Sequence, residues 1–456
     1  MTRLSLRLRI FLFFAALALA ATALAAGALA FGWSRAEPTL PTHPFLTAFI
    51  AFAFLNTGLV LAIWLLFDEN IAKPITRLSV DLRLRAHSGI DTPLAADAAR
   101  YLGDLAPAVS ALASRSGGQP AQSETARLEA QRERLTALLS EMPVATILIN
   151  PAQEIVLYDA QAAAILKRIG PPRLKAPLAE YFDTSVLAAA TPDTPFDLPF
   201  ADGQTRFEAR LRPLGRDGHM ILIEPQDDGL SPDDPRPLVF DFDLIDAPVP
   251  TDLNDTPLRD LCFVAFDTET TGLSVKTDAI VQIGAVRLLN GRIIQGETLD
   301  TYVDPGRPIP SASTRIHGIT DADVEGAPDI AIASRRLHDF ARDAVLVAHN
   351  APFDIGLLRE TAQQSGLDWS HPVLDTVLLS AVVFGTTEKH DLDALCARLS
   401  ITIPPGLRHT AFGDAKATGL VLEKLLPLLD AKGIATFGDL IAETRKHGRL
   451  LEDLNP

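Results

Sequence analysis

The sequence predicts a multidomain protein with two N-terminal transmembrane helices, a helical linker, a small α+β domain and a C-terminal α/β domain with a mixed five-stranded sheet. Three observations lead to this prediction. Two long apolar runs stand near the N-terminus, short strand-like segments separated by turns fill the middle, and strand and helix patterns alternate in the C-terminal part. With 456 residues, the chain is long enough for several domains.

The two apolar runs cover residues 10–33 and 44–67, and neither contains a charged residue. Each run exceeds the roughly 20 residues that a helix needs to cross a bilayer. We therefore expect residues 1–70 to form two transmembrane helices. A cleaved signal peptide is the alternative for the first run, because its ALAAGALA segment offers small residues.

Basic residues flank the two runs on their outer sides: Arg3, Arg7 and Arg9 before the first, and Lys73, Arg77, Arg83 and Arg85 after the second. The loop between the runs carries only Arg35 and Glu37 as charged residues. The positive-inside rule then places both ends in the cytoplasm. The sequence predicts a multi-pass protein of the inner or cell membrane whose C-terminal α/β domain is cytoplasmic, and removal of the first run would leave that domain in the cytoplasm.

Residues 71–141 are expected to be helical. Ile71, Ile75, Leu78 and Leu82 share one helical face, and a second helical pattern covers residues 96–114. A helix, a connector and a helix directly after a membrane span resemble a HAMP signal-relay module. A plain juxtamembrane linker is the alternative.

A short heptad pattern follows, with Leu128, Leu135 and Met142 seven residues apart. This spacing is compatible with a parallel coiled coil and therefore with a homodimer. An ordinary amphipathic helix explains two heptads equally well.

Residues 142–225 are expected to form the small α+β domain. Residues 142–166 have the pattern of a strand, a turn, a strand and a helix, and later strands are expected at 206–212 and 220–224. The opening resembles a PAS sensor domain, in which an Asn is common where this chain has Asp159. No His or Cys indicates haem or flavin, so a ligand sensor and a purely structural, dimerising domain both stay open. Residues 226–257 are rich in Asp and Pro, which is typical of a linker.

The α/β domain is expected over residues 258–430, followed by a helical tail over 431–456. Strands are predicted at residues 262–266, 280–288, 292–302 and 344–348, with a fifth near Val373. Asn290-Gly291 is a favoured two-residue hairpin turn between the second and third of these strands.

Four acids and one histidine stand at the ends of these elements: Asp267, Glu269, Asp354, His409 and Asp414. On an extended chain, the carboxylates of Asp267 and Glu269 project on the same side of the backbone. Oxygen ligands of this kind suit Mg²⁺. Four acids and a histidine suit two ions about 3.5 to 4 Å apart, which assist an in-line displacement. A histidine near its reference pKa can accept the proton of water at neutral pH.

The motifs DTETTG, HNAPFD and HTAFGD, in this order, resemble those of the DEDDh branch of the DnaQ-like 3′–5′ exonucleases, the family of the proofreading epsilon subunit of bacterial DNA polymerase III. The resemblance covers residues 258–426. It implies a ribonuclease H-like fold and two Mg²⁺ or Mn²⁺ ions held by Asp267, Glu269, Asp354 and Asp414. His409 would be the general base. The tyrosine branch of the family would have Tyr at position 410, where this chain has Thr.

The same resemblance implies a set of residues that bind the terminal nucleotide: Thr270, Leu273, Ile316, His317, Asn350 and Phe353. The family resemblance does not extend to a replisome role. We find no glutamine-led clamp-binding peptide in residues 427–456, and membrane spans do not belong to a replication subunit.

The formal net charge of −16 argues against a sequence-independent binder of duplex DNA, which would have a basic face. We therefore expect contact with 3′ ends of single-stranded or frayed DNA, with RNA as an alternative. The main prediction is a membrane-anchored, metal-dependent 3′–5′ exonuclease that a sensor region regulates. An exoribonuclease or oligonucleotide-degrading enzyme, and a non-catalytic membrane sensor with a nucleotide-binding domain, are the competing hypotheses.

Cys262 and Cys396 lack metal-ligand spacing and are expected to be reduced, buried thiols.

Overall fold

The computed structural model describes residues 6–35, 43–73, 75, 144–224, 238–245 and 252–455. The chain divides into two compact units, Met1–Gln122 and Ser123–Pro456, which are treated separately below. The HAMP-like segment beyond residue 75 and the heptad pattern lie outside the described residues, as does most of the predicted linker.

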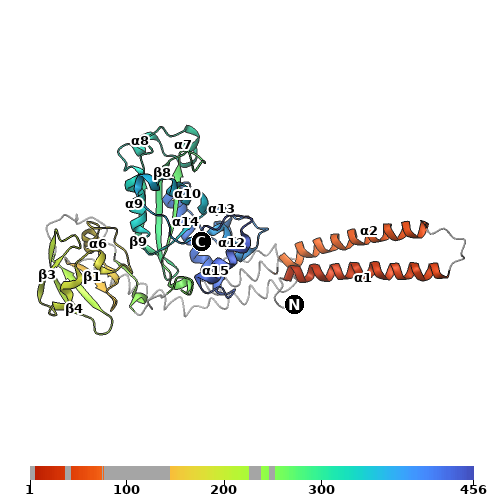
Figure 1. The fold of residues 1–456 in the computed structure, drawn as a ribbon, viewed down its shortest axis with the longest axis horizontal. Helices are drawn as coiled ribbons and strands as arrows, with labels where there is room; N and C mark the ends of the chain where they lie inside the picture. The colour runs from red at the N-terminus through yellow and green to blue at the C-terminus, as the bar shows by residue number, and fades with distance from the viewer. Residues whose placement is uncertain are drawn as a thin grey trace. The chain divides into compact units, whose positions relative to one another are not determined.

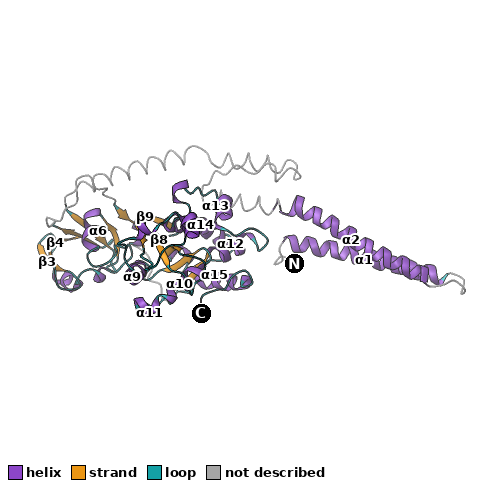
Figure 2. Ribbon diagram, turned by 90° about the horizontal axis from the view of Figure 1, so that it is seen from above, coloured by secondary structure: helices purple, strands orange, loops and turns teal. Residues whose placement is uncertain are grey.

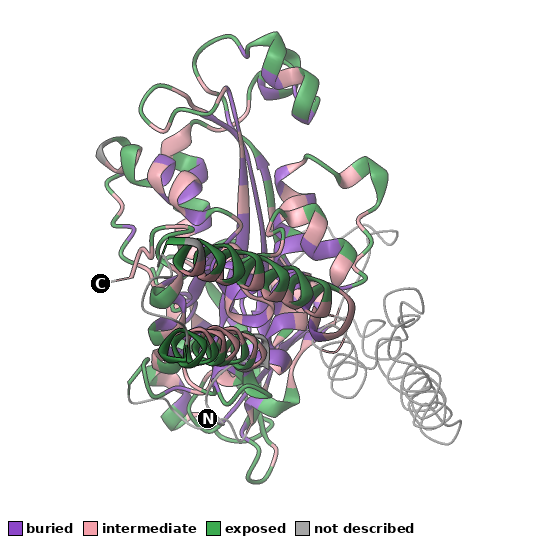
Figure 3. Ribbon diagram, turned by 90° about the vertical axis from the view of Figure 1, so that its right-hand side faces the viewer, coloured by how far each residue is buried: buried purple, intermediate pink, exposed green. Residues whose placement is uncertain are grey.

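The first unit contains two long apolar helices, α1 (Leu6–Ser34) and α2 (His43–Phe67), and α2 continues into the π-helical turn η1 (Asp68–Ala72). Figure 3 shows that most of their surface is exposed. The stretches Ile10–Ser34 and Phe45–Ala72 are long and apolar enough to cross a membrane. The side-chain amide of Asn56 on α2 donates a 3.1 Å hydrogen bond to the Ala18 carbonyl of α1.

The second unit begins with a small domain, residues 144–245, built on one six-stranded antiparallel sheet in the order β3-β4-β5-β1-β2-β6. Its strands are β1 (Ala145–Ile149), β2 (Ile155–Tyr158), β3 (Pro195–Pro199), β4 (Arg206–Pro213), β5 (His219–Ile223) and β6 (Val239–Phe240). Its helical elements are α6 (Ala160–Leu166), η3 (Leu178–Glu180), η4 (Thr184–Ala189) and η5 (Phe242–Leu244). One helix beside an antiparallel sheet is the α+β organisation that the sequence predicts.

Asp159 joins the helix of the small domain to its sheet. One carboxylate oxygen accepts the Ala162 N–H at 2.7 Å and so caps α6, while the other accepts the Thr146 N–H of β1 at 2.8 Å. Burial raises the pKa of this carboxyl, and these hydrogen bonds oppose the shift. Asp159 is therefore a structural link in the small domain.

The C-terminal domain, residues 252–455, contains the predicted mixed five-stranded sheet, in the order β11-β10-β7-β8-β9. Its strands are β7 (Phe263–Thr270), β8 (Ile280–Leu289), β9 (Arg292–Tyr302), β10 (Val345–Ala348) and β11 (Val373–Asp375). β7, β10 and β11 are parallel, whereas β8 is antiparallel to both β7 and β9. Figure 2 shows this sheet enclosed by helices.

Helices of this domain follow β9, β10 and β11: α7 (Ser311–His317), α8 (Asp321–Val324), α9 (Ile330–Phe340), α10 (Ala351–Glu360), α11 (Ala362–Ser365), α12 (Thr376–Phe384), α13 (Leu392–Arg398), α14 (Ala411–Asp430) and α15 (Phe437–Thr444). Single 3₁₀ turns are η6 (Leu258–Asp260), η7 (Pro405–Leu407) and η8 (Arg445–His447).

The predicted hairpin turn between β8 and β9 is confirmed. Asn290 has φ +49° and Gly291 has φ +69°, and the flanking Leu289 and Arg292 pair across the two strands. Two consecutive positive φ angles are the conformation that Asn-Gly favours in a two-residue hairpin.

β8 is buried over its whole length because helices cover both faces of the sheet. Figure 1 shows α9 and α14 on opposite sides of this strand. A Cβ atom on Gly284 would lie 2.2 Å from the backbone of Ala411 and Phe412, so the start of α14 touches the strand backbone directly. Only glycine permits this approach.

The small domain docks on β8 and β9 through buried polar contacts. The Glu297 carboxylate, completely buried, accepts hydrogen bonds from the Tyr158 hydroxyl (3.1 Å) and the Leu174 N–H (2.6 Å). Arg287 contacts the same carboxylate at 3.1 Å and donates to the Leu174 carbonyl at 3.1 Å. Together, Arg287 and Glu297 therefore bind both backbone polar groups of Leu174.

The residues after α14 pack onto the C-terminal domain. Leu258 donates its N–H to the Ala435 carbonyl at 2.8 Å. Near the C-terminus, the Asn455 side chain accepts the Val373 N–H at 2.9 Å and donates to the Val373 carbonyl at 2.6 Å. Asn455 thus satisfies backbone groups on the outer edge of β11, an edge that would otherwise be open to pairing.

Candidate active site

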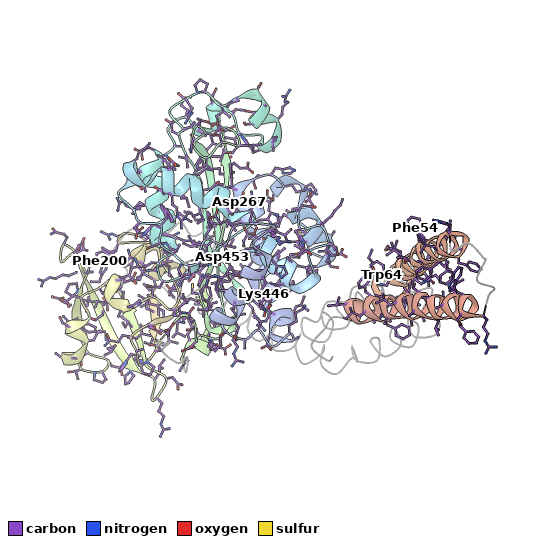
Figure 4. All side chains as sticks on the ribbon, turned by 45° about the vertical axis from the view of Figure 1, so that its right-hand side comes forward. Phe54, Trp64, Phe200, Asp267, Lys446 and Asp453 are labelled. Carbon is purple, nitrogen blue, oxygen red and sulfur yellow. The ribbon has the colours of Figure 1, made fainter. Side chains whose placement is uncertain are left out.

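The acid pair that follows the first predicted strand lies inside that strand. β7 runs past Phe266 to Thr270, and Asp267 pairs with Gly284 while Glu269 pairs with Gln282 of β8. The sequence pattern suggested an end at Phe266 because charged residues rarely continue a buried strand. The alternation along β7 places both carboxylates on the α14 side of the sheet. Figure 4 labels Asp267 in the C-terminal domain.

Three carboxylates converge at this point. Oxygen atoms of Asp267, Glu269 and Asp414 all lie within 4.8 Å of one another. The first two come from β7 and the third from the first turn of α14, which is far away in sequence. The fold therefore assembles the predicted acids from two elements.

The fourth predicted acid, Asp354, is bonded to the residue between the two acids of β7. Its Oδ1 accepts the Thr268 N–H at 3.1 Å and the Thr268 hydroxyl at 2.5 Å. Asp354 lies in the first turn of α10 and is 4% exposed. Sequence reasoning missed Thr268, because nothing marks a threonine between two acids as a hydrogen-bond donor to a distant helix.

Burial raises the pKa values of all four acids, and repulsion from the other carboxylates of the cluster adds to the shift for Asp267 and Glu269. The pKa of Glu269 rises to about 8, through burial first and then the charges of Asp414 and Asp354. Burial also raises the pKa of Asp354 to about 7, although the Thr268 hydrogen bonds oppose the shift. For Asp267 the pKa lies well above its ordinary value, and for Asp414 it is raised, in both cases with burial as the main cause. Such a cluster is costly unless a positive charge lies among its oxygens.

His409 lies in the loop directly before α14, with an exposed side chain and φ +56°. Its charge and its backbone N–H act on the Asp414 carboxyl, and both lower the pKa of that group. The Thr410 hydroxyl accepts the Gly413 N–H at 3.1 Å and caps the helix. A Cβ atom on Gly413 would lie 1.7 Å from the Leu407 carbonyl oxygen, so glycine is required for the loop to fold back on α14.

The start of α10 is held by Asp375 at the end of β11. Asn350 adopts a left-handed conformation (φ +68°) and makes no side-chain cap. Instead, the Asp375 carboxylate accepts the Ala351 N–H at 2.5 Å and the Val377 N–H at 2.7 Å. Asp375 thus stabilises the N-termini of two helices, and one of these helices carries Asp354.

The segment after β7 is bonded to α7. The Ser313 hydroxyl donates to the Thr271 carbonyl at 2.8 Å. The His317 ring accepts the Ile319 N–H at 3.0 Å and interacts with the Thr270 backbone, while burial lowers the pKa of its imidazole. The structure therefore brings together Thr270 and His317, two of the predicted substrate-binding residues.

The other predicted substrate-binding residues differ in exposure. Leu273, in the bend after β7, is 89% exposed, and Ile316 on α7 is 65% exposed. Asn350 is exposed, whereas Phe353 is half-buried and packs against the core. Leu273 and Ile316 are the two that offer an apolar surface to a ligand.

The chain matches the family model described as "Exonuclease" over residues 264–422. It is 32% identical to a DNA polymerase III subunit epsilon-like protein of Rhodobacter capsulatus, over 100% of both chains. The chain belongs to the DnaQ-like exonuclease family. The match to the family model covers β7, α10 and α14, the elements that carry the four acids.

Further relatives match a smaller share of the chain. A PolC-type DNA polymerase III of Halalkalibacterium halodurans is 38% identical over 40% of this chain, which spans 13% of that polymerase. Two solved structures are similar over parts of the chain. Exonuclease X, bound to 5′-overhanging duplex DNA, is 27% identical over 40% of this chain and 99% of its own, with a TM-score of 0.33. E. coli Exonuclease I, bound to a dA16 oligonucleotide, is 19% identical over 38% of this chain and 41% of its own, also with a TM-score of 0.33.

Membership of the DnaQ-like family and the carboxylate cluster both indicate that the protein depends on a divalent metal ion. Asp267, Glu269 and Asp414 supply the hard oxygen donors that Mg²⁺ and Mn²⁺ accept in proteins. Burial raises the pKa of all three carboxyls, and neighbouring carboxylates of the cluster raise those of Asp267 and Glu269 further, so a cation among these oxygens would be favourable. This family member is therefore a metal-dependent nuclease, a hydrolase acting on nucleic acid.

Proposed function

We propose that this protein is a membrane-anchored 3′–5′ exonuclease of the DEDDh type, which hydrolyses phosphodiester bonds at 3′ ends of nucleic acid, with DNA as the favoured substrate. One observation carries the proposal. Carboxylates of Asp267, Glu269 and Asp414 converge, and the Asp354 carboxylate of α10 is bonded to Thr268, which lies between the two acids of β7. The remaining motif residue, His409, lies in the loop directly before the helix that carries Asp414.

We assign the metal-binding role to Asp267, Glu269, Asp354 and Asp414. Two Mg²⁺ or Mn²⁺ ions held there would supply positive charge for the phosphate and a more acidic bound water. The protein's own contribution is to keep four carboxylates in place although they repel one another. The Thr268 hydrogen bonds to Asp354 and the cap of α14 at Thr410 support this role.

His409 is proposed as the general base. Its side chain is exposed to solvent, and its charge interacts with Asp414. A histidine changes its charge near neutral pH, which suits proton transfer from water. A protein that only binds nucleotides would have no need of this residue.

The 3′ end is proposed to bind over the segment after β7 and α7. Leu273 and Ile316 offer exposed apolar side chains, against which bases can pack. Thr270 follows Glu269 at the end of β7, His317 interacts with its backbone, and Asn350 and Phe353 stand at the start of α10. Packing on bases tolerates many sequences, as expected for an exonuclease.

The N-terminal part is proposed as a membrane anchor and regulator. α1 and α2 have the length and hydropathy of spans, and the basic residues that flank them support a cytoplasmic catalytic domain. The PAS-like small domain is bonded to β8 and β9 by Arg287 and Glu297, and these strands adjoin β7. This contact supports control of the nuclease by the small domain, with dimerisation through the HAMP-like region as a further part of the proposal.

The full-length protein in detergent, given a 5′-labelled single-stranded DNA and Mn²⁺, tests the proposal. We expect a ladder of progressively shorter labelled products, which shows removal from the 3′ end, and no ladder in EDTA. Release of labelled mononucleotide as the first product would instead indicate attack from the 5′ end. The variants Asp267→Asn and His409→Ala should both lose the ladder.

The same assay with duplex DNA, RNA and dinucleotides separates the competing substrates. Faster shortening of RNA than of DNA would favour the exoribonuclease alternative. DNA binding without shortening, unchanged in His409→Ala, would favour the non-catalytic sensor.

A further inference from the structure

Gln282 is a buried amide on β8 that none of the proposed catalytic roles uses. It is 5% exposed and interrupts an otherwise apolar stretch of the strand. It lies directly opposite Glu269 on β7 and opposite Tyr302 on β9. Side chains of directly paired residues are on the same face of a sheet, so the amide lies on the α14 side, as does the carboxylate of Glu269.

The two ends of this amide bind different elements. Its Oε1 accepts the Ala411 N–H at 3.1 Å, and its Nε2 donates to Asp300 Oδ1 of β9 at 2.8 Å. Because a backbone N–H can only donate and a carboxylate can only accept, these partners fix the orientation of the amide. Gln282 therefore connects β9 to α14 across β8.

Ala411 is the first residue of α14, and its N–H has no partner within the helix. Its side of the helix is packed against the β8 backbone at Gly284, where even a Cβ atom would find no room. Gln282 thus satisfies a buried N–H group that would otherwise be left without an acceptor.

Asp414 follows Ala411 by three residues, within the same first turn of α14. The position of the helix start on β8 therefore decides where the Asp414 carboxylate lies relative to the two acids of β7. We propose that Gln282 is a positioning residue, which places Asp414 against Asp267 and Glu269 by holding the Ala411 N–H. This inference rests on the proposed function, because it names the residue that aligns the metal-binding acids of that site.

The variant Gln282→Met tests the inference, because it keeps the length of the side chain and removes both hydrogen bonds. We expect Mn²⁺ affinity, measured by calorimetry on the full-length protein, to fall about 10- to 100-fold, the loss typical of removing a group that orients a metal ligand. We also expect kcat on a 5′-labelled oligonucleotide to fall while KM changes little, because the surface of Leu273 and Ile316 is untouched.

The control Ile283→Val distinguishes a positioning role of Gln282 from a purely structural one. Ile283 is fully buried, is next to Gln282 and points to the opposite face of β8. This control should lower the thermal unfolding midpoint and leave Mn²⁺ affinity as in the wild type. A Gln282→Met variant with wild-type Mn²⁺ affinity and a lowered midpoint would overturn the inference.

A polarity exchange supplies the rescue. In the double variant Gln282→Glu with Asp300→Asn, the new carboxylate accepts from both Ala411 and the new amide, and the total charge is unchanged. We expect this double variant to regain most of the Mn²⁺ affinity and kcat that Gln282→Met loses. The single variants Gln282→Glu and Asp300→Asn should each bind Mn²⁺ more weakly than the double variant. Failure of the double variant to exceed both single variants would contradict the inference. If the wild type itself bound no Mn²⁺, the proposed function would fail before any variant was needed.

Discussion

Asp354 accepts two hydrogen bonds from Thr268, one from its N–H at 3.1 Å and one from its hydroxyl at 2.5 Å. Thr268 is the residue that separates Asp267 from Glu269 on β7. The α10 acid is thereby bound to the strand that carries the other two, and one residue sets the spacing of three carboxylates. Hydrogen bonds to an ionised carboxylate are among the stronger ones in proteins.

The variant Thr268→Val should therefore weaken metal binding while the fold remains. The valine keeps the backbone N–H and loses the hydroxyl, so Asp354 is held by one hydrogen bond instead of two. We expect Mn²⁺ affinity or activity to fall about 10-fold or more. Thr301→Val on β9 is the matched control, because the Thr301 hydroxyl donates only to the neighbouring Tyr302 carbonyl. Equal Mn²⁺ affinities in the two variants would contradict the role of Thr268.

Asp267→Asn should abolish activity and stabilise the metal-free protein. The change removes a half-buried carboxylate that the charges of Asp354, Asp414 and Glu269 repel. We expect kcat to fall by at least about 10²-fold, the loss typical of removing one preorganised electrostatic group. The free energy of unfolding in EDTA should rise by about 1 kcal/mol. Urea unfolding with and without EDTA measures the second effect. If the variant in EDTA were less stable than the wild type in EDTA, repulsion between the carboxylates would not be what destabilises the metal-free protein.

The stability of the metal-free protein should fall as the pH rises. Burial raises the pKa of Glu269 to about 8 and that of Asp354 to about 7, whereas unfolded carboxyls titrate near about 4. Their protonation therefore favours the folded state, with the full contribution below about pH 4 and a progressive loss up to about pH 8. We expect the thermal midpoint in EDTA to fall from pH 5 to pH 8, and to fall less in Glu269→Gln.

Added Mn²⁺ should reverse this loss at pH 8, because the ion binds the ionised carboxylates. Identical pH profiles for the wild type and Glu269→Gln in EDTA would show that this carboxyl does not titrate as the structure implies.

Removal of Glu297 should destabilise the unit that holds both the small and the C-terminal domain. Glu297 is completely buried and binds Arg287, Tyr158 and the Leu174 N–H. Glu297→Ala leaves the Arg287 charge buried without its partner, which costs about 3–5 kcal/mol. Glu224→Ala breaks an exposed ion pair with Arg210 and should cost at most about 1 kcal/mol. Similar losses in the two variants, measured by urea unfolding, would contradict the importance of the buried contact.

Much of the C-terminal fold could be predicted from local patterns. Asn290-Gly291 predicted the hairpin, because a two-residue hairpin turn needs positive φ angles at both positions and Asn and Gly adopt them readily. The four acids and His409 were recognisable because their types, order and motif surroundings follow a known family. The two apolar helices followed from hydropathy alone.

Other features depend on contacts between distant segments, which no local pattern encodes. The strand β7 continues through its acids because these residues pair with Gly284 and Gln282 of β8, which cannot be seen in residues 263–270 alone. Thr268, Gln282 and Asp375 act through hydrogen bonds to residues more than twenty positions away. The sequence does mark Gln282 as a polar residue within an apolar strand, but only the fold shows that its partner is Ala411.

Calorimetric titration of the full-length protein with Mn²⁺ at pH 8 tests most directly whether these carboxylates form a catalytic metal site. We expect two ions per chain in the wild type, and loss of at least one of them in Asp267→Asn. Absence of Mn²⁺ uptake by the wild type, or the same uptake in Asp267→Asn, would contradict the account.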